Sequence, residues 1–187
     1  MLNRGMSKSQ VEEELSTKGD FVKIDLLTKF LREELSLDMK KFVYLKLAGI
    51  YEKLKMPGNA AKMFDNAAIA SIAFSEKIKF HLKEAESYIK SGCFDNVNAA
   101  IKKAMNDANA SQKSEIVFHI KRFYLHEAEK NEMEMKRNQA SKIYERLLKM
   151  RLSHQEEREI KNKLVNLYEK LGKFKESEVI RSGIENI

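Results

Sequence analysis

A short pattern of aromatic and small residues returns along this chain and limits the folds that it can adopt. The pattern is most complete as Tyr44-x2-Leu47-Ala48-x2-Tyr51 followed by Ala60-x3-Phe64-x2-Ala67. A similar arrangement returns about 37 residues later, around Tyr88. Self-similarity at such a period is typical of repeat proteins, in which each unit packs only on its neighbours. The sequence therefore predicts an array of similar units.

Five anchor positions place the units along the chain. The anchors are Leu15, Tyr51, Tyr88, Tyr124 and Tyr168, at intervals of 36, 37, 36 and 44 residues. The last interval is stretched, because the second-helix pattern marked by Ala140 and Tyr144 begins late. The stretch 127–137 holds no glycine or proline, so we predict that the helix containing Phe123 runs on through it rather than giving way to a loop.

The composition limits the fold class. The chain has 187 residues with seven glycines, one proline and 34% charged residues, which suits amphipathic helices and leaves too few turn residues for a sheet protein. We expect an all-α chain of about ten helices in one domain covering 1–187. The predicted units span roughly 7–35, 38–72, 75–110, 114–150 and 154–187.

Helix boundaries can be read from capping residues. Ser153 with Glu156 predicts a capping box, and Ser75 and Ser114 are predicted N-caps. Gly92 and Gly172 stand where the first helix of a pair must end, because glycine adopts a positive φ at little cost. Pro57-Gly58 is predicted to form the same kind of turn earlier in the chain.

The unit from Tyr44 to Ala67 resembles tetratricopeptide repeats at every diagnostic spacing, and weaker matches extend over nearly the whole chain. The resemblance implies a right-handed α-solenoid of antiparallel helix pairs whose first helices line a concave groove. It does not extend to the carboxylate clamp of chaperone adaptors. Leu45, Gly49 and Lys83 stand where that clamp has lysine, asparagine and asparagine.

Positive charge recurs at fixed places on the predicted first helices. The net charge is +7 and the pI about 9.3. In each of the four later units, the residues five before and two after the anchor are basic or histidine: Lys46 and Lys53, Lys83 and Lys90, His119 and His126, Lys163 and Lys170. Under the resemblance this stripe faces the groove, where Arg122 adds to it. The alternative is that these side chains are only the solvated face of amphipathic helices.

These features predict a protein-interaction module that binds an acidic segment of another protein in a basic groove. The apolar anchors of such a groove are expected to be Phe42, Leu45, Leu82, Ile89, Phe118 and Leu125. One alternative is binding of RNA or single-stranded nucleic acid on the same face. Another is a structural scaffold that assembles by stacking its ends.

Catalytic and cofactor motifs do not occur in the sequence. It lacks a phosphate-binding glycine loop, an H-E-x-x-H pair and a Cys-x-x-Cys pair, so we expect no enzyme, no cofactor and no metal. Glu115 and His119 share a helix face but are too few to hold a metal ion. The lone Cys93 and the absence of an apolar N-terminal segment favour a cytoplasmic protein without a membrane span.

The C-terminal residues predict self-association. The apolar stripe of the last predicted helix consists of Val179, Ile180, Ile184 and Ile187. One neighbouring helix cannot cover both of its sides, so a two-fold dimer through this helix is expected. The alternative is that Gly183 breaks the helix and folds the final residues back over the core.

Overall fold

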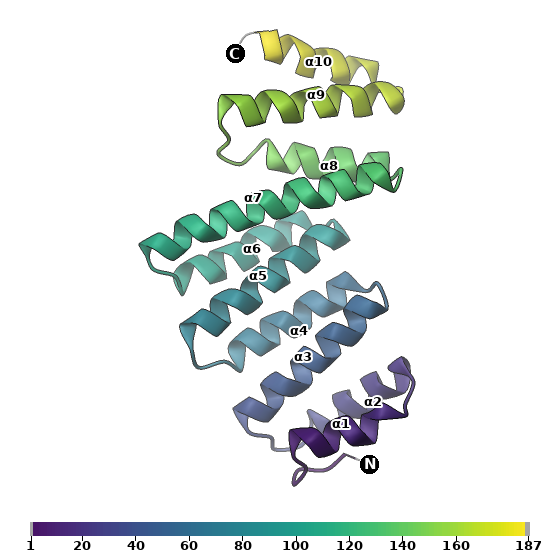
Figure 1. Cartoon of the computed structure of the whole chain (residues 1–187), viewed down its shortest axis with the longest axis vertical. Helices are drawn as coiled ribbons and strands as arrows, with labels where there is room; N and C mark the ends of the chain where they lie inside the picture. The colour runs from purple at the N-terminus through teal and green to yellow at the C-terminus, as the bar shows by residue number, and fades with distance from the viewer. Residues whose placement is uncertain (1, 186–187) are drawn as a thin grey trace. The chain divides into compact units, whose positions relative to one another are not determined.

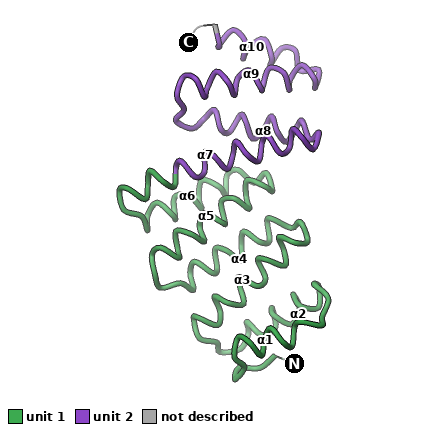
Figure 2. The backbone as a smooth tube through the Cα atoms, viewed as in Figure 1, with its two compact units in different colours: residues 1–116 green, residues 117–187 purple. Residues whose placement is uncertain are grey.

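A computed structural model describes residues 2–185, which form ten α-helices and no strand (Figure 1). The helices are α1 (Lys8–Ser16), α2 (Asp20–Phe30), α3 (Leu37–Lys53), α4 (Pro57–Ile69), α5 (Phe74–Ser91), α6 (Phe94–Asn106), α7 (Ala110–Met133), α8 (Arg137–Leu147), α9 (His154–Lys170) and α10 (Phe174–Glu185). The all-α class predicted from the composition is therefore confirmed. The chain divides into two compact units, residues 1–116 (unit 1) and 117–187 (unit 2) (Figure 2).

Unit 1 is built from helices that pack on their neighbours in the sequence. Helix α3 contacts α4, α4 contacts α5 and α5 contacts α6, and short turns connect them. Ala48, Ala60 and Ala67 are completely buried between α3 and α4, with Phe64 and Phe80 in the same cluster. Small side chains at these positions let the helix backbones approach closely, and the aromatic rings fill the remaining space.

The core of unit 2 lies along α8 and α9, and α9 also packs on α10. Tyr144 and Tyr168 are buried there, and their hydroxyls donate hydrogen bonds to Glu132 (2.7 Å) and Glu145 (2.8 Å). These bonds satisfy the polar end of each ring, which an apolar core would otherwise leave unpaired. Burial raises the pKa of Tyr124, in α7, to about 12.

Helices α3, α5, α7 and α9, the first helices of the four later predicted pairs, end in the same turn. The residues with positive φ in these turns are Lys55 (56°), Gly92 (73°), Met135 (60°) and Gly172 (72°). In each turn the next amide donates to a carbonyl five residues earlier: Met56 to Tyr51 (2.8 Å), Cys93 to Tyr88 (3.0 Å), Lys136 to Asn131 (2.8 Å) and Lys173 to Tyr168 (2.8 Å). This is the Schellman motif, which satisfies carbonyls at the end of a helix.

Two expectations about glycine and proline have different outcomes. Gly92 and Gly172 do adopt a positive φ, as predicted. The prediction for Pro57-Gly58 is wrong, because Lys55 takes the left-handed conformation. Pro57 instead opens α4 at its first helical position, where its fixed φ suits the helix and its missing N–H costs nothing.

The expected N-caps also differ. The capping box of Ser153 and Glu156 is confirmed. Ser75 lies inside the first turn of α5, and Ser114 lies inside α7, so neither is a cap. Before α7 the cap is Asn109, whose side chain accepts a 2.9 Å hydrogen bond from the amide of Gln112. Asparagine is as favourable as serine at this position, because its side-chain oxygen also accepts a hydrogen bond from a backbone amide of the first turn.

Helix α7 continues without a break to Met133, so the helix containing Phe123 does run on into the stretch 127–137, but it ends there in the turn at 134–136. Its terminal turn shows that the residue equivalent to Tyr51 is Asn131, seven positions after Tyr124. The anchor intervals from Tyr51 are therefore 37, 43 and 37 residues, and Met133 stands two after the anchor, where the other units have lysine. The Tyr124 register is corrected because hydrogen bonding fixes the end of the helix, while spacing alone allows a slip of two turns.

One alternative for the C-terminal helix, an early break at Gly183, is wrong. Helix α10 passes through Gly183 and reaches Glu185, so the predicted early break does not occur. The ammonium of Lys161 in α9 donates a 3.0 Å hydrogen bond to the carbonyl of Gly183. Val179 is 71% exposed, Ile180 and Ile184 are half-buried, and Ile187 lies outside the described residues.

Candidate functional site

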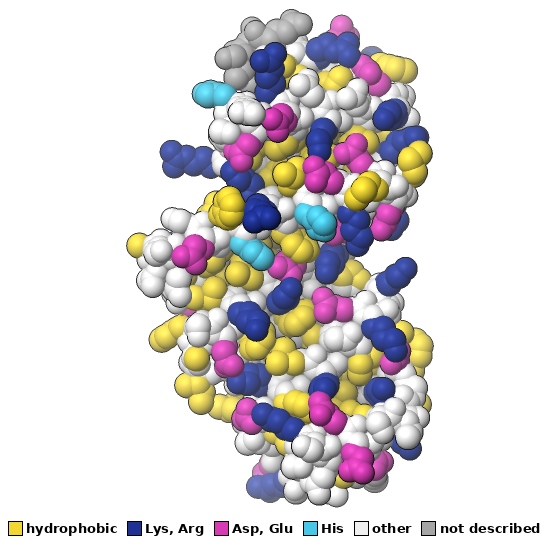
Figure 3. All heavy atoms as spheres, viewed as in Figure 1, with side chains coloured by type: hydrophobic (Ala, Val, Ile, Leu, Met, Phe, Trp, Pro, Cys, Tyr) yellow, Lys and Arg dark blue, Asp and Glu magenta, His cyan; other side chains and the backbone are white. Residues whose placement is uncertain are grey.

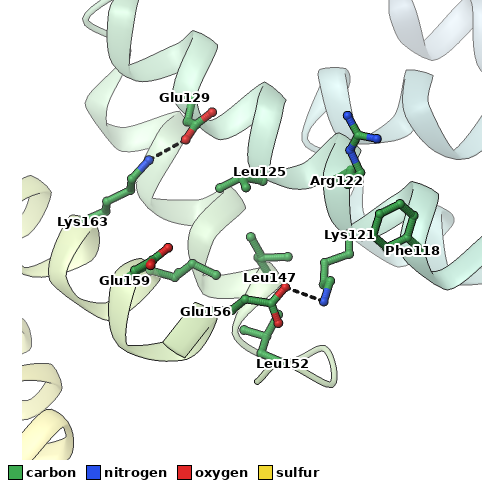
Figure 4. A pocket seen from close by; sticks show the side chains of 11 residues that line it. Phe118, Lys121, Arg122, Leu125, Glu129, Leu147, Leu152, Glu156, Glu159 and Lys163 are labelled. Carbon is green, nitrogen blue, oxygen red and sulfur yellow. Dashed lines mark hydrogen bonds and ion pairs between the residues drawn. The ribbon is translucent and has the colours of Figure 1, made fainter. Parts of the chain in front are cut away.

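Unit 2 contains a hollow of about 130 Å³ between α7 and α9 (Figure 4). We call it the α7–α9 hollow. Its lining consists of Phe118, Lys121, Arg122, Leu125, Glu129, Leu147, Leu152, Glu156, Glu159, Ile160 and Lys163. These side chains come from α7, the end of α8, the connection between α8 and α9, and α9 itself.

The centre of the α7–α9 hollow is apolar. Leu147 and Ile160 are buried, while Leu125 and Leu152 are partly exposed. Leu125 lies between the side chains of Lys163 and Lys121 in the close view (Figure 4). The hollow therefore offers apolar surface to a side chain from outside.

Two ion pairs connect α7 to α9 across the hollow. Lys121 Nζ lies 2.7 Å from Glu156 Oε1, and Lys163 Nζ lies 2.6 Å from Glu129 Oε1. Glu156 also accepts hydrogen bonds from the amide (2.8 Å) and hydroxyl (2.9 Å) of Ser153. The bond from Lys121, followed by those from Ser153, lowers the pKa of Glu156 from 4.5 to about 2. Glu156 is thus held as a carboxylate and fixes Lys121.

Arg122 has a different environment from the two paired lysines. Its guanidinium carbon lies 5.7 Å from the centroid of the Phe118 ring, within range of a cation–π interaction. Phe118 is 58% exposed, and Arg122 is also exposed. Within residues 2–185 no carboxylate forms an ion pair with Arg122. The remaining charge, Glu159, accepts a 3.1 Å hydrogen bond from Gln155 of its own helix.

The structure brings together four of the residues predicted for the groove. Phe118, Arg122, Leu125 and Lys163 all line the α7–α9 hollow. The other three predicted residues of unit 2, His119, His126 and Lys170, are exposed and do not line it.

In unit 1 the predicted basic stripe is paired with carboxylates. Lys46 pairs with Glu12, Lys53 with Asp20 (2.7 Å), Lys83 with Glu86 (2.8 Å) and Lys90 with Glu52 (3.8 Å). On the face drawn in Figure 3, basic and acidic side chains alternate rather than forming one positive area. The stripe is therefore offset by acidic neighbours, most of them about one repeat earlier in the chain.

The predicted apolar anchors of unit 1 are less accessible than those of unit 2. Ile89 is only 1% exposed and belongs to the core. Phe42, Leu45 and Leu82 are half-buried. The ammonium of Lys46 lies 5.3 Å from the centroid of the Phe42 ring, so a cation already covers part of that ring.

Sequence reasoning missed a buried charged cluster in unit 1. His81 Nδ1 lies 2.9 Å from Glu84 Oε2 and 3.7 Å from Asp65 Oδ1. Such atoms could ligate a metal, since the three ligand atoms lie within 4.8 Å of one another. However, Lys103 Nζ already bonds Asp65 (2.7 Å) and Glu84 (3.1 Å), so an ammonium is the cation of this cluster. The i,i+3 spacing of His81 and Glu84 was the signal available in the sequence.

Sequence reasoning also missed most of the lining of the α7–α9 hollow. Lys121 and Glu156 are 35 residues apart, close to one repeat period, which is the spacing that could have indicated their contact. Leu152 could have been noticed as an apolar residue in a polar connection between Arg151 and Ser153.

Comparison of the chain with protein-family models, with curated proteins and with solved structures gives no significant match. Among the helices of residues 2–185, none combines the length and apolar character needed to cross a bilayer.

Proposed function

We propose that this chain is a non-enzymatic, cytoplasmic interaction module of the tetratricopeptide type, a right-handed array of helix pairs, and that it binds an acidic segment of another protein. The observation that carries the proposal is the α7–α9 hollow. Phe118, Arg122, Leu125 and Lys163, four of the seven groove residues predicted for unit 2, line this hollow. Their meeting at one site supports the idea that the first helices present a binding surface.

The chemistry of the hollow favours a protein segment as the ligand. Protein interfaces combine a desolvated apolar centre with a polar rim, and a few anchors in pockets supply most of the binding free energy. Here the apolar centre of Leu125, Leu147 and Ile160 is bordered by charged side chains. An exposed phenylalanine under an arginine adds an anchor type that is common in such interfaces.

The paired lysines of unit 1 are compatible with an acidic partner. Ion pairs on a protein surface contribute only about 0–1 kcal/mol each, so a partner carboxylate can replace an internal one at small cost. The side chains of Lys46 and Glu12 are 42% and 51% exposed, which leaves their contact open to such exchange. The charges then contribute to steering and specificity more than to affinity.

Separate binding measurements with an acidic peptide and with an RNA test the proposal. We would measure binding of a fluorescent glutamate-rich peptide with apolar residues, and of a single-stranded RNA of equal charge, by anisotropy at low and moderate salt. The variant Lys46→Glu/Lys83→Glu/Lys90→Glu should bind the peptide more weakly, while the matched control Lys62→Glu/Lys79→Glu/Lys102→Glu, at other exposed positions, should not.

Two results would contradict the proposal. One is equal peptide affinity in the wild type and the first triple variant. The other is tighter binding of the RNA with a steep dependence on salt, which would indicate nucleic-acid binding instead.

A further inference from the structure

We infer that the α7–α9 hollow receives one aliphatic or aromatic side chain of a partner segment, and that a carboxylate next to this side chain binds Arg122. The inference rests on the proposed function and makes it specific. It names the site, the anchor residue and the charge beside it.

The size of the hollow limits which side chain of the partner can serve as the anchor. A volume of about 130 Å³ is close to that of the roughly 150 Å³ apolar cavity that accommodates benzene in other proteins. One side chain the size of leucine, methionine or phenylalanine therefore fits. Leu125, Leu147 and Ile160 line the hollow, and their side chains have no polar atom that could form a hydrogen bond with a polar side chain of the partner.

The charges around the hollow indicate what stands next to the anchor. Lys121 and Lys163 are each committed to a glutamate on the facing helix. Glu156 is further fixed by Ser153, so Lys121 cannot turn to a new partner without leaving this carboxylate uncompensated. Arg122 is thus the cation lining the hollow that a ligand carboxylate can bind without displacing a carboxylate of residues 2–185, and arginine binds carboxylates in a bidentate manner.

The two ends of the hollow differ in charge, and this difference sets the direction in which the partner segment lies across it. Arg122 and Phe118 lie at one side of the close view, and Glu159 lies towards the other (Figure 4). A carboxylate near Glu159 would be repelled, whereas one near Arg122 would be attracted. The acidic residue of the segment therefore lies on the Phe118 side of the anchor.

Methyl NMR of the full chain with short peptides tests this arrangement. Three peptides of identical flanking sequence would carry Leu-Asp, Leu-Lys or Ser-Asp at their centre, titrated into protein labelled at leucine and isoleucine methyl groups. We expect Leu-Asp to shift the resonances of Leu125, Leu147, Leu152 and Ile160. Leu-Lys and Ser-Asp should bind about tenfold more weakly, because each lacks one of the two contacts.

A charge reversal at the recognition residue sharpens the test. Arg122→Glu should reverse the preference, so that Leu-Lys binds more tightly than Leu-Asp. Arg158→Glu is the matched control, since Arg158 is an exposed arginine of α9 that does not line the hollow, and it should keep the wild-type order. An unchanged methyl spectrum in the free protein verifies the fold. If Arg122→Glu fails this check, Arg122→Gln replaces it and should abolish the preference.

The outcomes separate this inference from the proposed function. Equal affinity for Leu-Asp and Leu-Lys, or no shift at the four hollow residues, overturns the inference. If shifts appear instead around Lys46 in unit 1, the inference is wrong while the proposed function stands. If the hollow binds Leu-Asp as expected but the triple lysine variant retains its peptide affinity, the inference stands, while the proposed function fails where it assigns binding to the basic stripe of unit 1.

Discussion

Four of the helices end at a residue whose backbone adopts the left-handed conformation, and only two of these residues are glycines. Lys55 and Met135 adopt φ values of 56° and 60°, where an L-residue with a side chain is about 1–2 kcal/mol less stable than in its usual conformations. The hydrogen bonds of the turn hold them there. Lysine and methionine at these positions therefore reduce the stability of the fold.

The first prediction follows from these turns. Lys55→Gly should raise the free energy of unfolding by up to about 1 kcal/mol. Glycine removes the backbone strain of the folded state, and this gain exceeds the free-energy cost of the greater conformational entropy that glycine gives the unfolded chain. Gly92→Ala should lower it by about 1 kcal/mol, although a Cβ there meets nothing within 4 Å. Urea denaturation measures both changes.

Gly49→Ala is the control for this prediction. Gly49 lies inside α3, and a Cβ there also meets nothing within 4 Å. The same substitution should raise stability by about 0.5–1 kcal/mol, since alanine is favoured within a helix. A loss of stability at Gly49 equal to that at Gly92 would show that backbone conformation is not the cause.

The second prediction concerns the pH dependence of Glu156. Its folded pKa of about 2 lies below its ordinary value of 4.5, so its stabilising contribution is complete above pH 4.5 and is lost as the pH falls towards 2. The side chain is 41% exposed, and solvent screening limits the contribution to about 1 kcal/mol. Glu156→Gln should therefore be less stable than the wild type at neutral pH and equally stable near pH 2.

Thermal unfolding at several pH values measures this difference. Glu178→Gln, which removes an exposed carboxylate of α10, is the control for the loss of one surface charge. A constant difference between Glu156→Gln and the wild type across the acidic range would contradict the explanation.

At the scale of helices, the buried cluster of unit 1 connects three elements. Lys103 of α6 reaches Asp65 of α4 and Glu84 of α5. Its pKa is raised by these two carboxylates, although burial acts in the opposite direction as the largest single effect. Glu84 is buried, so its charge depends on partners within the protein.

The third prediction tests this connection. Lys103→Met should cost about 2 kcal/mol, because it leaves a buried carboxylate without its cation. Lys102→Met, an exposed neighbour on the same helix, should change stability by less than about 0.5 kcal/mol. Chemical denaturation compares the two, and Glu84→Gln in the Lys103→Met background should restore part of the loss. If the two lysine variants are equally stable, the cluster does not hold these helices together.

At the scale of the whole molecule, the fourth prediction is the oligomeric state. We propose a two-fold dimer through α10, whose Val179 is 71% exposed. Burying apolar side chains against a second copy would remove them from water. Light scattering at micromolar concentration should give twice the mass of one chain for the wild type and a single-chain mass for Val179→Lys.

Val22→Lys is the control, because Val22 is an exposed apolar residue of α2 in unit 1. It should leave the mass unchanged. A wild-type protein that scatters as a single chain would refute the dimer.

The local features of this protein can be predicted from short stretches of its sequence. The all-α class, the continuous α7, the left-handed Gly92 and Gly172, and the capping box at Ser153 all follow from patterns within a few residues of one another. Helix periodicity and capping are interactions between near neighbours in the chain, so the sequence displays them directly. Four residues of the α7–α9 hollow were among the predicted groove residues, but Phe118 and Leu125 came from the register of α7 that the structure corrects.

The contacts between residues of different helices follow from the packing of those helices and could not be predicted from the sequence. The pairing of Lys163 with Glu129, the cluster around Lys103 and the place of Leu152 in the hollow depend on how separate helices pack. The register of α7 at Asn131 depended on the hydrogen bonds of a turn that spacing could not fix. A lysine on a helix face has the same sequence pattern whether it points to a carboxylate 34 residues away or to water, because that choice is made by packing.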